Sequence, residues 1–152
     1  MNFLSLEQMP LAEVQNRVGR LRGHLQSLCP NASGLLVFSR LGIYYLSGSW
    51  ANGVLWVPMA GEPILLCRKG LQRSRLDSPL SLILEYKSYA QLPGLLQEAG
   101  LPLGEQVAVE MTGLSWSMGE LLRSKLPGTD FVSGDMALNW TRAVKTAWEL
   151  DK

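Results

Sequence analysis

Short apolar runs at close spacing are the feature that most restricts how this 152-residue chain can fold. They lie at residues 34–39, 53–59, 62–67, 81–86, 106–110 and 130–133. Runs of this length, bounded by turn residues, predict buried strands. The second and third are separated by a short turn around Gly61, which predicts a hairpin. Residues 43–49 are also interpreted as extended, which leaves a tight four-residue loop at 49–52 before the next strand.

Helical periodicity precedes and follows these runs. A stripe of apolar residues at three- and four-residue steps predicts a helix over residues 10–28, through Leu11, Val14, Val18, Leu21, Leu25 and Leu28. Similar patterns predict helices over residues 92–99, closed by Gly100, and over residues 114–126. A first helix, a hairpin-rich section and then alternating strands and helices are typical of one α/β domain. Its sheet is expected to be mixed, antiparallel first and parallel later.

Composition argues against several classes of partner. The net charge of +1 gives no general attraction to nucleic acid or to an anionic membrane, so neither partner is expected. No apolar run approaches the roughly 20 residues of a membrane span. The first ten residues lack the basic segment and apolar core of a secretion signal, so a cytoplasmic location is expected. Cys29 and Cys67 are then expected to be buried free thiols.

Residues suited to catalysis or metal binding are scarce. The single histidine, His24, lies among arginines on the polar side of the first helix, and a solvated surface position is expected. One histidine and two distant cysteines do not supply the ligands of a zinc site. Glu85 and Glu110 end two strands and either form a pair that binds Mg²⁺ or, as we favour, are solvated strand ends. We therefore expect no catalytic residue, metal or cofactor in this chain.

A basic segment follows the third strand and contains Arg68, Lys69, Arg73 and Arg75. Such a cluster can bind a phosphate group or an acidic partner. A solvated or salt-bridged helix face is favoured instead, because no aromatic residues interleave with the charges and the net charge is close to zero. The sequence leaves open whether this cluster has a role.

The C-terminal segment predicts the beginning of a further helix. Thr146 is a good N-cap, and Glu149 follows three residues later, which is the spacing of a capping box. The sequence stops about one turn later, too soon for a stable isolated helix. We expect the residues after about Arg142 to be poorly tied down, and Trp148 to be exposed to water in a monomer.

Three short motifs occur in a recognisable order. The element "YLSG" consists of Tyr45, Leu46, Ser47 and Gly48, and "QVAVE" lies at residues 106–110. Near the end, Arg142, Lys145, Thr146 and Glu149 have a fixed spacing. Together they resemble the "YLTG", "iGvE" and closing motifs of the N-terminal domain of the creatinase/prolidase/aminopeptidase P family, with serine in place of threonine and Gln106 at the usual glycine. The resemblance covers residues 14–149.

The resemblance implies a ribonuclease H-like α/β fold, a mixed β-sheet flanked by helices, over residues 1–141. Residues 142–152 are then the start of the linker helix to a C-terminal pita-bread catalytic domain that is not in this sequence. That domain holds two divalent metal ions (Mn, Co or Zn) in the family. The chain is thus expected to be the non-catalytic N-terminal domain of an Xaa-Pro dipeptidase or aminopeptidase P-like metallopeptidase.

The expected partners are this catalytic domain, a second subunit in a homodimer and the peptide substrate of the parent protein. In relatives the N-terminal domain helps to form the dimer and overhangs an active site, which limits substrate length. Two other parents remain open. One is a creatinase-like small-amide hydrolase, and the other is a metal-free homologue that acts as a peptide-binding module.

The loop at residues 49–52 is the segment for which we predict a functional role. Gly48 and Gly53 flank it and allow sharp turns, and a tight loop exposes its side chains. By analogy with the overhanging position in relatives, Trp50 and Asn52 are expected to face the substrate. An aromatic face suits a proline ring, and an amide suits a peptide backbone. The alternative, that Trp50 folds back and caps the sheet edge, remains open.

Overall fold

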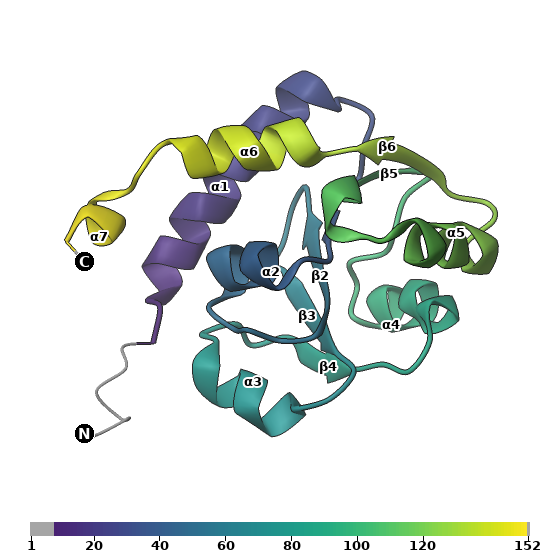
Figure 1. The fold of residues 1–152 in the computed structure, drawn as a ribbon, viewed down its shortest axis with the longest axis horizontal. Coiled ribbons are helices and arrows are strands. Elements are labelled where there is room, and N and C mark those ends of the chain that lie inside the picture. The colour runs from purple at the N-terminus through teal and green to yellow at the C-terminus, as the bar shows by residue number, and fades with distance from the viewer. Residues whose placement is uncertain (1–7, 152) are drawn as a thin grey trace.

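The structure, a computed structural model, describes residues 8–151. In this part of the chain a six-stranded sheet is flanked by helices on both faces (Figure 1). The strands are β1 (Gly34–Val37), β2 (Gly53–Pro58), β3 (Ile64–Cys67), β4 (Ile83–Glu85), β5 (Gln106–Val109) and β6 (Asp130–Ser133). The α-helices are α1 (Leu11–Leu28), α2 (Arg40–Ser47), α3 (Leu71–Asp77), α4 (Leu92–Glu98), α5 (Trp116–Lys125), α6 (Asp135–Ala143) and α7 (Ala147–Leu150).

The strand order across the sheet is β4-β3-β2-β1-β5-β6. The pairs β1–β2 and β2–β3 are antiparallel, whereas β3–β4, β1–β5 and β5–β6 are parallel. The mixed sheet and the β2–β3 hairpin that the sequence predicts are therefore confirmed. Among the described strands β2 alone runs against the others, so the carboxyl ends of the remaining strands meet at one edge of the sheet.

Alternating side chains of the central strands divide the core into two layers. Leu35 and Val37 of β1 belong to the layer under α1, α2 and α6, whereas Leu36 belongs to the layer under α4 and α5. Trp56 on β2 is fully buried in the second layer, and its indole N–H donates to the Leu101 carbonyl oxygen at 2.9 Å. The period of two is the one expected of strands covered on both faces.

Helix α2 replaces the extended segment that was predicted at residues 43–49, so that prediction is wrong. The Ser39 hydroxyl accepts from the Gly42 amide at 2.9 Å and caps the first turn. Gly48, with φ of 81°, ends the helix in the left-handed conformation. Ile43 and Leu46, three residues apart, are both fully buried against the sheet. These caps and this packing outweigh the strand propensity of Ile43 and its neighbouring tyrosines.

The other predicted helices are present with small differences at their ends. The first helix begins at Leu11, behind Pro10 as its N-cap, and ends at Leu28 as expected. Helix α6 is not among the elements predicted from the sequence, and it crosses α1 on one face of the sheet (Figure 1). None of the helices within residues 8–151 combines the length and apolar character needed to cross a membrane.

Candidate functional site

A surface cavity beside α2 brings the predicted loop and part of the basic segment together. Its volume is about 430 Å³, and the side chains that line it include Arg40, Trp50, Asn52, Lys69, Arg73 and Asp77. We call this cavity the Trp50 pocket. It lies at the sheet edge where β1 and β3 end and β2 begins. In open α/β sheets, ligands bind outside the carboxyl ends of strands, and the pocket has that position.

Trp50 belongs to the loop that follows α2, and its ring packs against that helix. Its ring stacks on the Tyr44 ring with centroids 4.8 Å apart and an interplanar angle of 15°, and 53% of the residue is exposed. The indole is thus held by one partner while much of it remains open to solvent. Asn52 is exposed too, and its carbonyl oxygen accepts from the Arg68 amide at 3.2 Å, which fixes the loop to the end of β3. That both side chains face a substrate stays a prediction.

The base of the Trp50 pocket is closed by polar groups that bond to one another. The buried Ser49 hydroxyl donates to the Ser74 hydroxyl at 3.2 Å, and the Cys67 thiol donates to the same oxygen at 3.3 Å. Burial raises the pKa of Cys67, which keeps it a thiol rather than a nucleophilic thiolate. Cys29 and Cys67 are both buried and free, as the sequence predicts.

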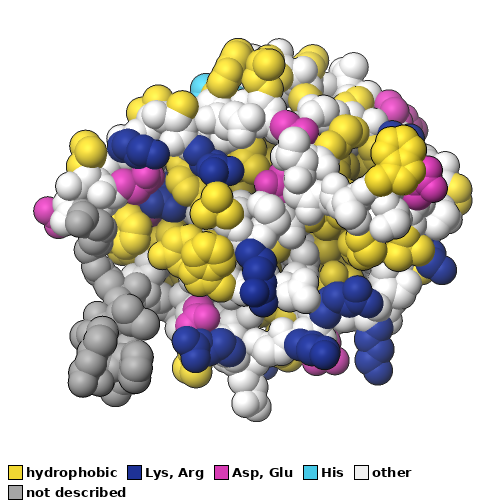
Figure 2. Space-filling view, viewed as in Figure 1, with side chains coloured by type: hydrophobic (Ala, Val, Ile, Leu, Met, Phe, Trp, Pro, Cys, Tyr) yellow, Lys and Arg dark blue, Asp and Glu magenta, His cyan; other side chains and the backbone are white. Residues whose placement is uncertain are grey.

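The residues of the basic segment lie in two different environments. Lys69 and Arg73 line the Trp50 pocket, and Arg73 Nε lies 3.1 Å from the Asp77 carboxylate. Arg68 is directed elsewhere, since it donates to the Lys87 carbonyl oxygen at 2.9 Å and its guanidinium lies 5.7 Å from the Tyr86 ring centre. Lys and Arg side chains gather around α2 and α3 on the face that Figure 2 shows.

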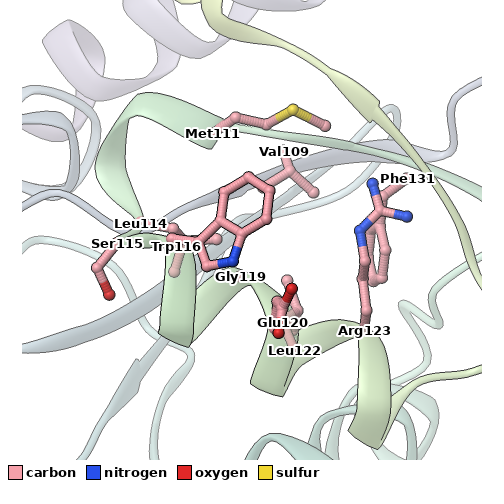
Figure 3. A pocket seen from close by; sticks show the side chains of 10 residues that line it. All are labelled: Val109, Met111, Leu114, Ser115, Trp116, Gly119, Glu120, Leu122, Arg123 and Phe131. Atoms are coloured by element: carbon pink, nitrogen blue, oxygen red, sulfur yellow. The ribbon is translucent and has the colours of Figure 1, made fainter.

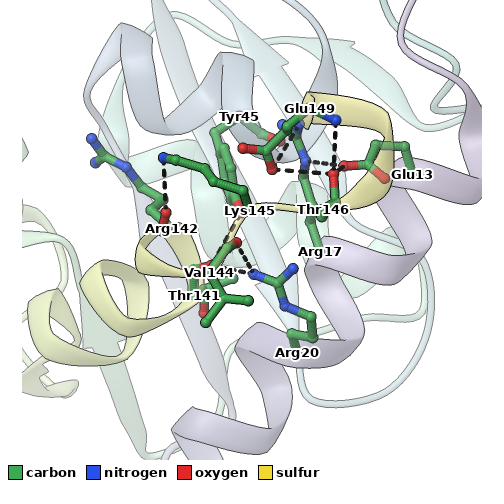
Figure 4. Close-up of polar contacts among 10 residues, drawn as sticks. All are labelled: Glu13, Arg17, Arg20, Tyr45, Thr141, Arg142, Val144, Lys145, Thr146 and Glu149. Carbon is green, nitrogen blue, oxygen red and sulfur yellow. Dashed lines mark hydrogen bonds and ion pairs between the residues drawn. The ribbon is translucent and has the colours of Figure 1, made fainter. Parts of the chain in front are cut away.

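A buried network of charges joins α1, α2 and α7 on the other side of α2 (Figure 4). Arg17, only 3% exposed, contacts Glu13 at 2.7 Å and Glu149 at 3.2 Å. It also donates to the Tyr45 carbonyl oxygen at 2.7 Å, and its guanidinium lies 4.1 Å from the centre of the Tyr45 ring. We call this set, completed by Thr146, the Arg17 network. Burial raises the pKa of the Tyr45 hydroxyl, which donates to the Thr141 carbonyl oxygen.

The C-terminal segment is held by this network. The Thr146 hydroxyl donates to the Glu13 carboxylate at 2.7 Å and accepts from the Glu149 amide at 3.1 Å, so the predicted N-cap is confirmed. Trp148 is half-buried, packs against the core and lies 5.4 Å from the Arg17 guanidinium. The expectation that residues after Arg142 are poorly tied down and that Trp148 is exposed is therefore wrong, because α1 supplies a buried ion pair as a docking site.

The motif residues lie in different places. Tyr45, Leu46 and Ser47 are buried in the last turn of α2, which Gly48 closes. Glu149 joins the Arg17 network, whereas Arg142 and Lys145 contact each other through the Lys145 ammonium and the Arg142 carbonyl oxygen at 3.4 Å. The structure places none of the motif residues in the lining of the Trp50 pocket.

Arg17 and Glu13 were missed as site residues, although their spacing is a signal. A glutamate four residues before an arginine is a favourable helical pair. Both flank the apolar stripe of the first helix, so a position at the boundary of the core could have been expected. Arg40 was missed as well, because it lines the Trp50 pocket only through the turn into α2 that the sequence interpretation did not include.

Glu110 is a buried capping residue, so the favoured interpretation of a solvated strand end is wrong for it. It is 4% exposed and accepts from the Phe38 amide at 2.9 Å, the Ser39 amide at 2.8 Å and the Ser39 hydroxyl at 2.7 Å. Glu85 is exposed on β4, and three strands separate β4 from β5. Strands lie about 4.8 Å apart, so these two carboxylates are too distant to share a metal ion.

His24 is partly buried rather than fully solvated. Its ring meets the Trp140 ring of α6 edge-on, with centroids 5.6 Å apart and an interplanar angle of 81°. Within residues 8–151 no three His, Cys, Asp or Glu side chains lie close enough together to hold a metal ion. The residues of the described domain therefore do not fit the dinuclear metal site that the family resemblance implies for a parent protein.

A second pocket, of about 450 Å³, lies between the end of β5 and α5, and its lining is mostly apolar. Figure 3 shows Trp116 among its side chains, together with Met111, Leu114, Glu120, Arg123 and Phe131. Trp116 is 84% exposed. Its indole therefore forms an exposed wall of this pocket.

Comparison with known proteins identifies a sequence family and solved structures that this chain resembles. The sequence profile of the Creatinase/Prolidase N-terminal domain matches residues 17–144. No curated protein sequence matches the chain at a significant level. Solved structures of low sequence identity share the fold, with TM-scores up to 0.74.

Three of these structures show the extent of the likeness. An X-Pro aminopeptidase from Thermotoga maritima MSB8 has a TM-score of 0.74 at 15% identity over 89% of this chain. An Xaa-Pro dipeptidase from Bacillus anthracis has a TM-score of 0.72 at 15% identity over 91%. This chain spans 38% of the length of each. The N-terminal domain of the cytoplasmic peptidase PepQ from Mycobacterium tuberculosis H37Rv has a TM-score of 0.67 at 19% identity, and the match covers 84% of this chain and 98% of that domain.

Proposed function

This chain belongs to the creatinase/prolidase N-terminal domain family, and from that membership we propose that it is the non-catalytic N-terminal domain of an Xaa-Pro dipeptidase or aminopeptidase P-like hydrolase. The observation that carries the proposal is the family match over residues 17–144. The fold shared with the N-terminal domain of a cytoplasmic peptidase supports it, and the proposal includes that cellular location.

The proposed role in such a protein is to cover an active site and select short substrates. The Trp50 pocket supports this role, because it presents an exposed aromatic ring and an exposed amide at the carboxyl-end edge of the sheet. Two divalent metal ions are proposed for a catalytic domain, and the ligands would come from outside residues 8–151. The described residues would position substrate and exclude water from the site.

The proposal also includes a homodimer. The exposed Trp116 beside a mostly apolar pocket supports it, since subunit contacts commonly cover such surfaces. Sedimentation of the longest product of this reading frame tests the assembly. We expect a dimer, and a monomer at high protein concentration would contradict this part of the proposal.

The activity is tested with two preparations, the 152-residue chain and the longest product of its own reading frame. Xaa-Pro dipeptides and longer Xaa-Pro peptides are offered to both, with Mn²⁺, Co²⁺ or Zn²⁺. We expect no cleavage by the chain alone and metal-dependent cleavage by the longer product. Cleavage of creatine-like amides instead would indicate the small-amide hydrolase, and peptide binding without cleavage would indicate the binding module.

A further inference from the structure

The Arg17 network holds a helix that is too short to be stable by itself. Helix α7 has four residues, and an isolated helix of that length gains almost nothing from its own hydrogen bonds. Its position therefore depends on contacts with the rest of the domain. Two of these contacts reach the first two turns of α1, from Thr146 to Glu13 at 2.7 Å and from Glu149 to Arg17 at 3.2 Å.

The connection between α6 and α7 is bound to the same helix (Figure 4). Arg20 of α1 donates to the carbonyl oxygens of Thr141 and Val144, to the second at 3.0 Å. Trp148 of α7 is half-buried and lies 5.4 Å from the Arg17 guanidinium. Both the connection and the short helix are therefore attached to α1.

A buried group of charges is a costly way to attach a helix. Ions lose their hydration when they are buried, and the replacement of a buried ion network by apolar residues of similar volume often leaves stability unchanged or higher. Apolar contact is non-directional, whereas a hydrogen bond requires a defined distance and angle. What the Arg17 network adds to simple apolar packing is therefore a defined orientation of α7.

We propose that the Arg17 network sets the direction in which α7 leaves the domain, and that Glu13, Arg17 and Glu149 are positioning residues for a catalytic domain attached to α7. The second half of this inference rests on the proposed function. A domain that covers an active site has to be placed accurately, since a misplacement of about 1 Å can lower a rate about a hundredfold. The network supplies that accuracy where a four-residue helix cannot.

The first arm of the test measures the orientation of α7 in the 152-residue chain. The variant Glu13→Met/Arg17→Met/Glu149→Met removes all three charges together and keeps the Thr146 cap. Its Tm should exceed that of Arg17→Met, which leaves two buried carboxylates without their cation. Residual dipolar couplings at the amides of residues 147–150 should fall, because α7 then samples several directions, while those of α1 stay unchanged. Unchanged couplings in α7 would show that apolar packing of Trp148 sets its direction and would overturn the proposal.

A milder variant and a matched control complete this arm. Glu149→Gln removes one partly exposed charge and leaves the pair of Glu13 and Arg17 in place, so the same couplings should fall less. The control is Glu98→Met/Glu105→Met/Lys125→Met, which removes the same charges from exposed positions outside the network. It should leave the couplings of α7 unchanged. An equal reduction in the control would show an effect of overall charge and would overturn the proposal.

The second arm uses the longest product of the reading frame and measures small-angle scattering, metal content and Xaa-Pro cleavage. The triple-methionine variant of the network should enlarge the radius of gyration and lower kcat/KM at least about tenfold at unchanged metal content, whereas the control should change neither. Xaa-Pro cleavage with unchanged scattering and rate in the network variant would overturn the positioning role and leave the proposed function standing. A larger radius in a product that cleaves no Xaa-Pro peptide would support the positioning role and contradict the peptidase.

Discussion

Two neighbouring tyrosines of α2 lie in different environments, one beside the buried Arg17 network and the other beside the Trp50 pocket. Consecutive helical residues are about 100° apart, so Tyr44 and Tyr45 point to different sides. Tyr45 contacts the Arg17 network, in which every charged group is paired within the protein. Tyr44 supports Trp50 at a pocket lined by Arg40 and Lys69, for which the described residues provide no ion-pair partner. The charges of the Arg17 network are buried and paired with one another, whereas those of Arg40 and Lys69 have no ion-pair partner among the described residues.

The largest expected loss of stability comes from a substitution in the Arg17 network. Arg17→Met keeps most of the apolar stem of the side chain but removes the cation that neutralises Glu13 and Glu149. Removing one partner of a buried ion pair costs about 3–5 kcal/mol. We expect urea unfolding to show a loss of free energy of unfolding in that range.

Arg73→Met is the matched control for this change. Its ion pair with Asp77 has the same spacing along a helix, but the Arg73 side chain is 76% exposed. Exposed pairs contribute up to about 1 kcal/mol, so a loss below that value is expected. Equal losses of unfolding free energy in the two variants would contradict the distinction between the buried Arg17 network and the exposed charges of the Trp50 pocket.

A smaller effect is expected from Thr146→Val, which removes the hydroxyl and keeps the shape of the side chain. The Glu13 carboxylate loses a donor, and the Glu149 amide loses its cap. A loss of about 1–3 kcal/mol is expected from a buried group left without its partner. Hydrogen exchange should accelerate most at residues 147–151, and Thr146→Ser should restore protection. Unchanged exchange in Thr146→Val would mean that apolar packing of Trp148 alone holds α7.

The parts of the molecule also differ in how well the sequence predicts them. The apolar stripe of α1 and the runs of β1 to β6 were predicted correctly, because burial imposes a period on consecutive residues. The tail was predicted to be loose, since a four-residue helix has little stability of its own. What holds it is Glu13, which lies 133 positions earlier in the sequence than Thr146. Contacts of that separation leave no local pattern.

The candidate site was predicted in its parts but not as a whole. Trp50 and Asn52 were selected from their tight loop, and Lys69 and Arg73 from a run of charges. Their meeting in one pocket depends on α2, which was interpreted as extended because Ile43 and its tyrosine neighbours have strand propensity. The signals that decide for a helix are Ser39 and Gly48, one at each end. Glu110 was likewise misplaced, because its three donors come from the turn that leads into α2.

A modest effect on stability is expected from Trp50→Ala. The variant loses the stack on Tyr44, and such aromatic pairs contribute about 0.5–1.5 kcal/mol. In the longer product the variant should raise KM for Xaa-Pro peptides with little change in kcat, because the pocket has no catalytic group. Tyr44→Phe keeps the stack and is the control. A loss of about 3–5 kcal/mol, typical of a core aromatic, would show that Trp50 is a core residue instead.

The smallest effect is expected from Lys69→Gln, and its sign is informative. Lys69 shares the Trp50 pocket with Arg40, and neither is paired within the described chain. Removing one of two like charges should change stability by less than about 0.5 kcal/mol, as exposed substitutions usually do. At low ionic strength the change should be a small gain in Tm, which disappears as salt screens the repulsion. Arg75→Gln, outside the pocket, should show no such gain. A Tm loss in Lys69→Gln at every salt concentration would mean that Lys69 stabilises the fold. A salt-sensitive gain is what a pocket that keeps unneutralised charge for a ligand predicts, because such sites are not optimised for stability.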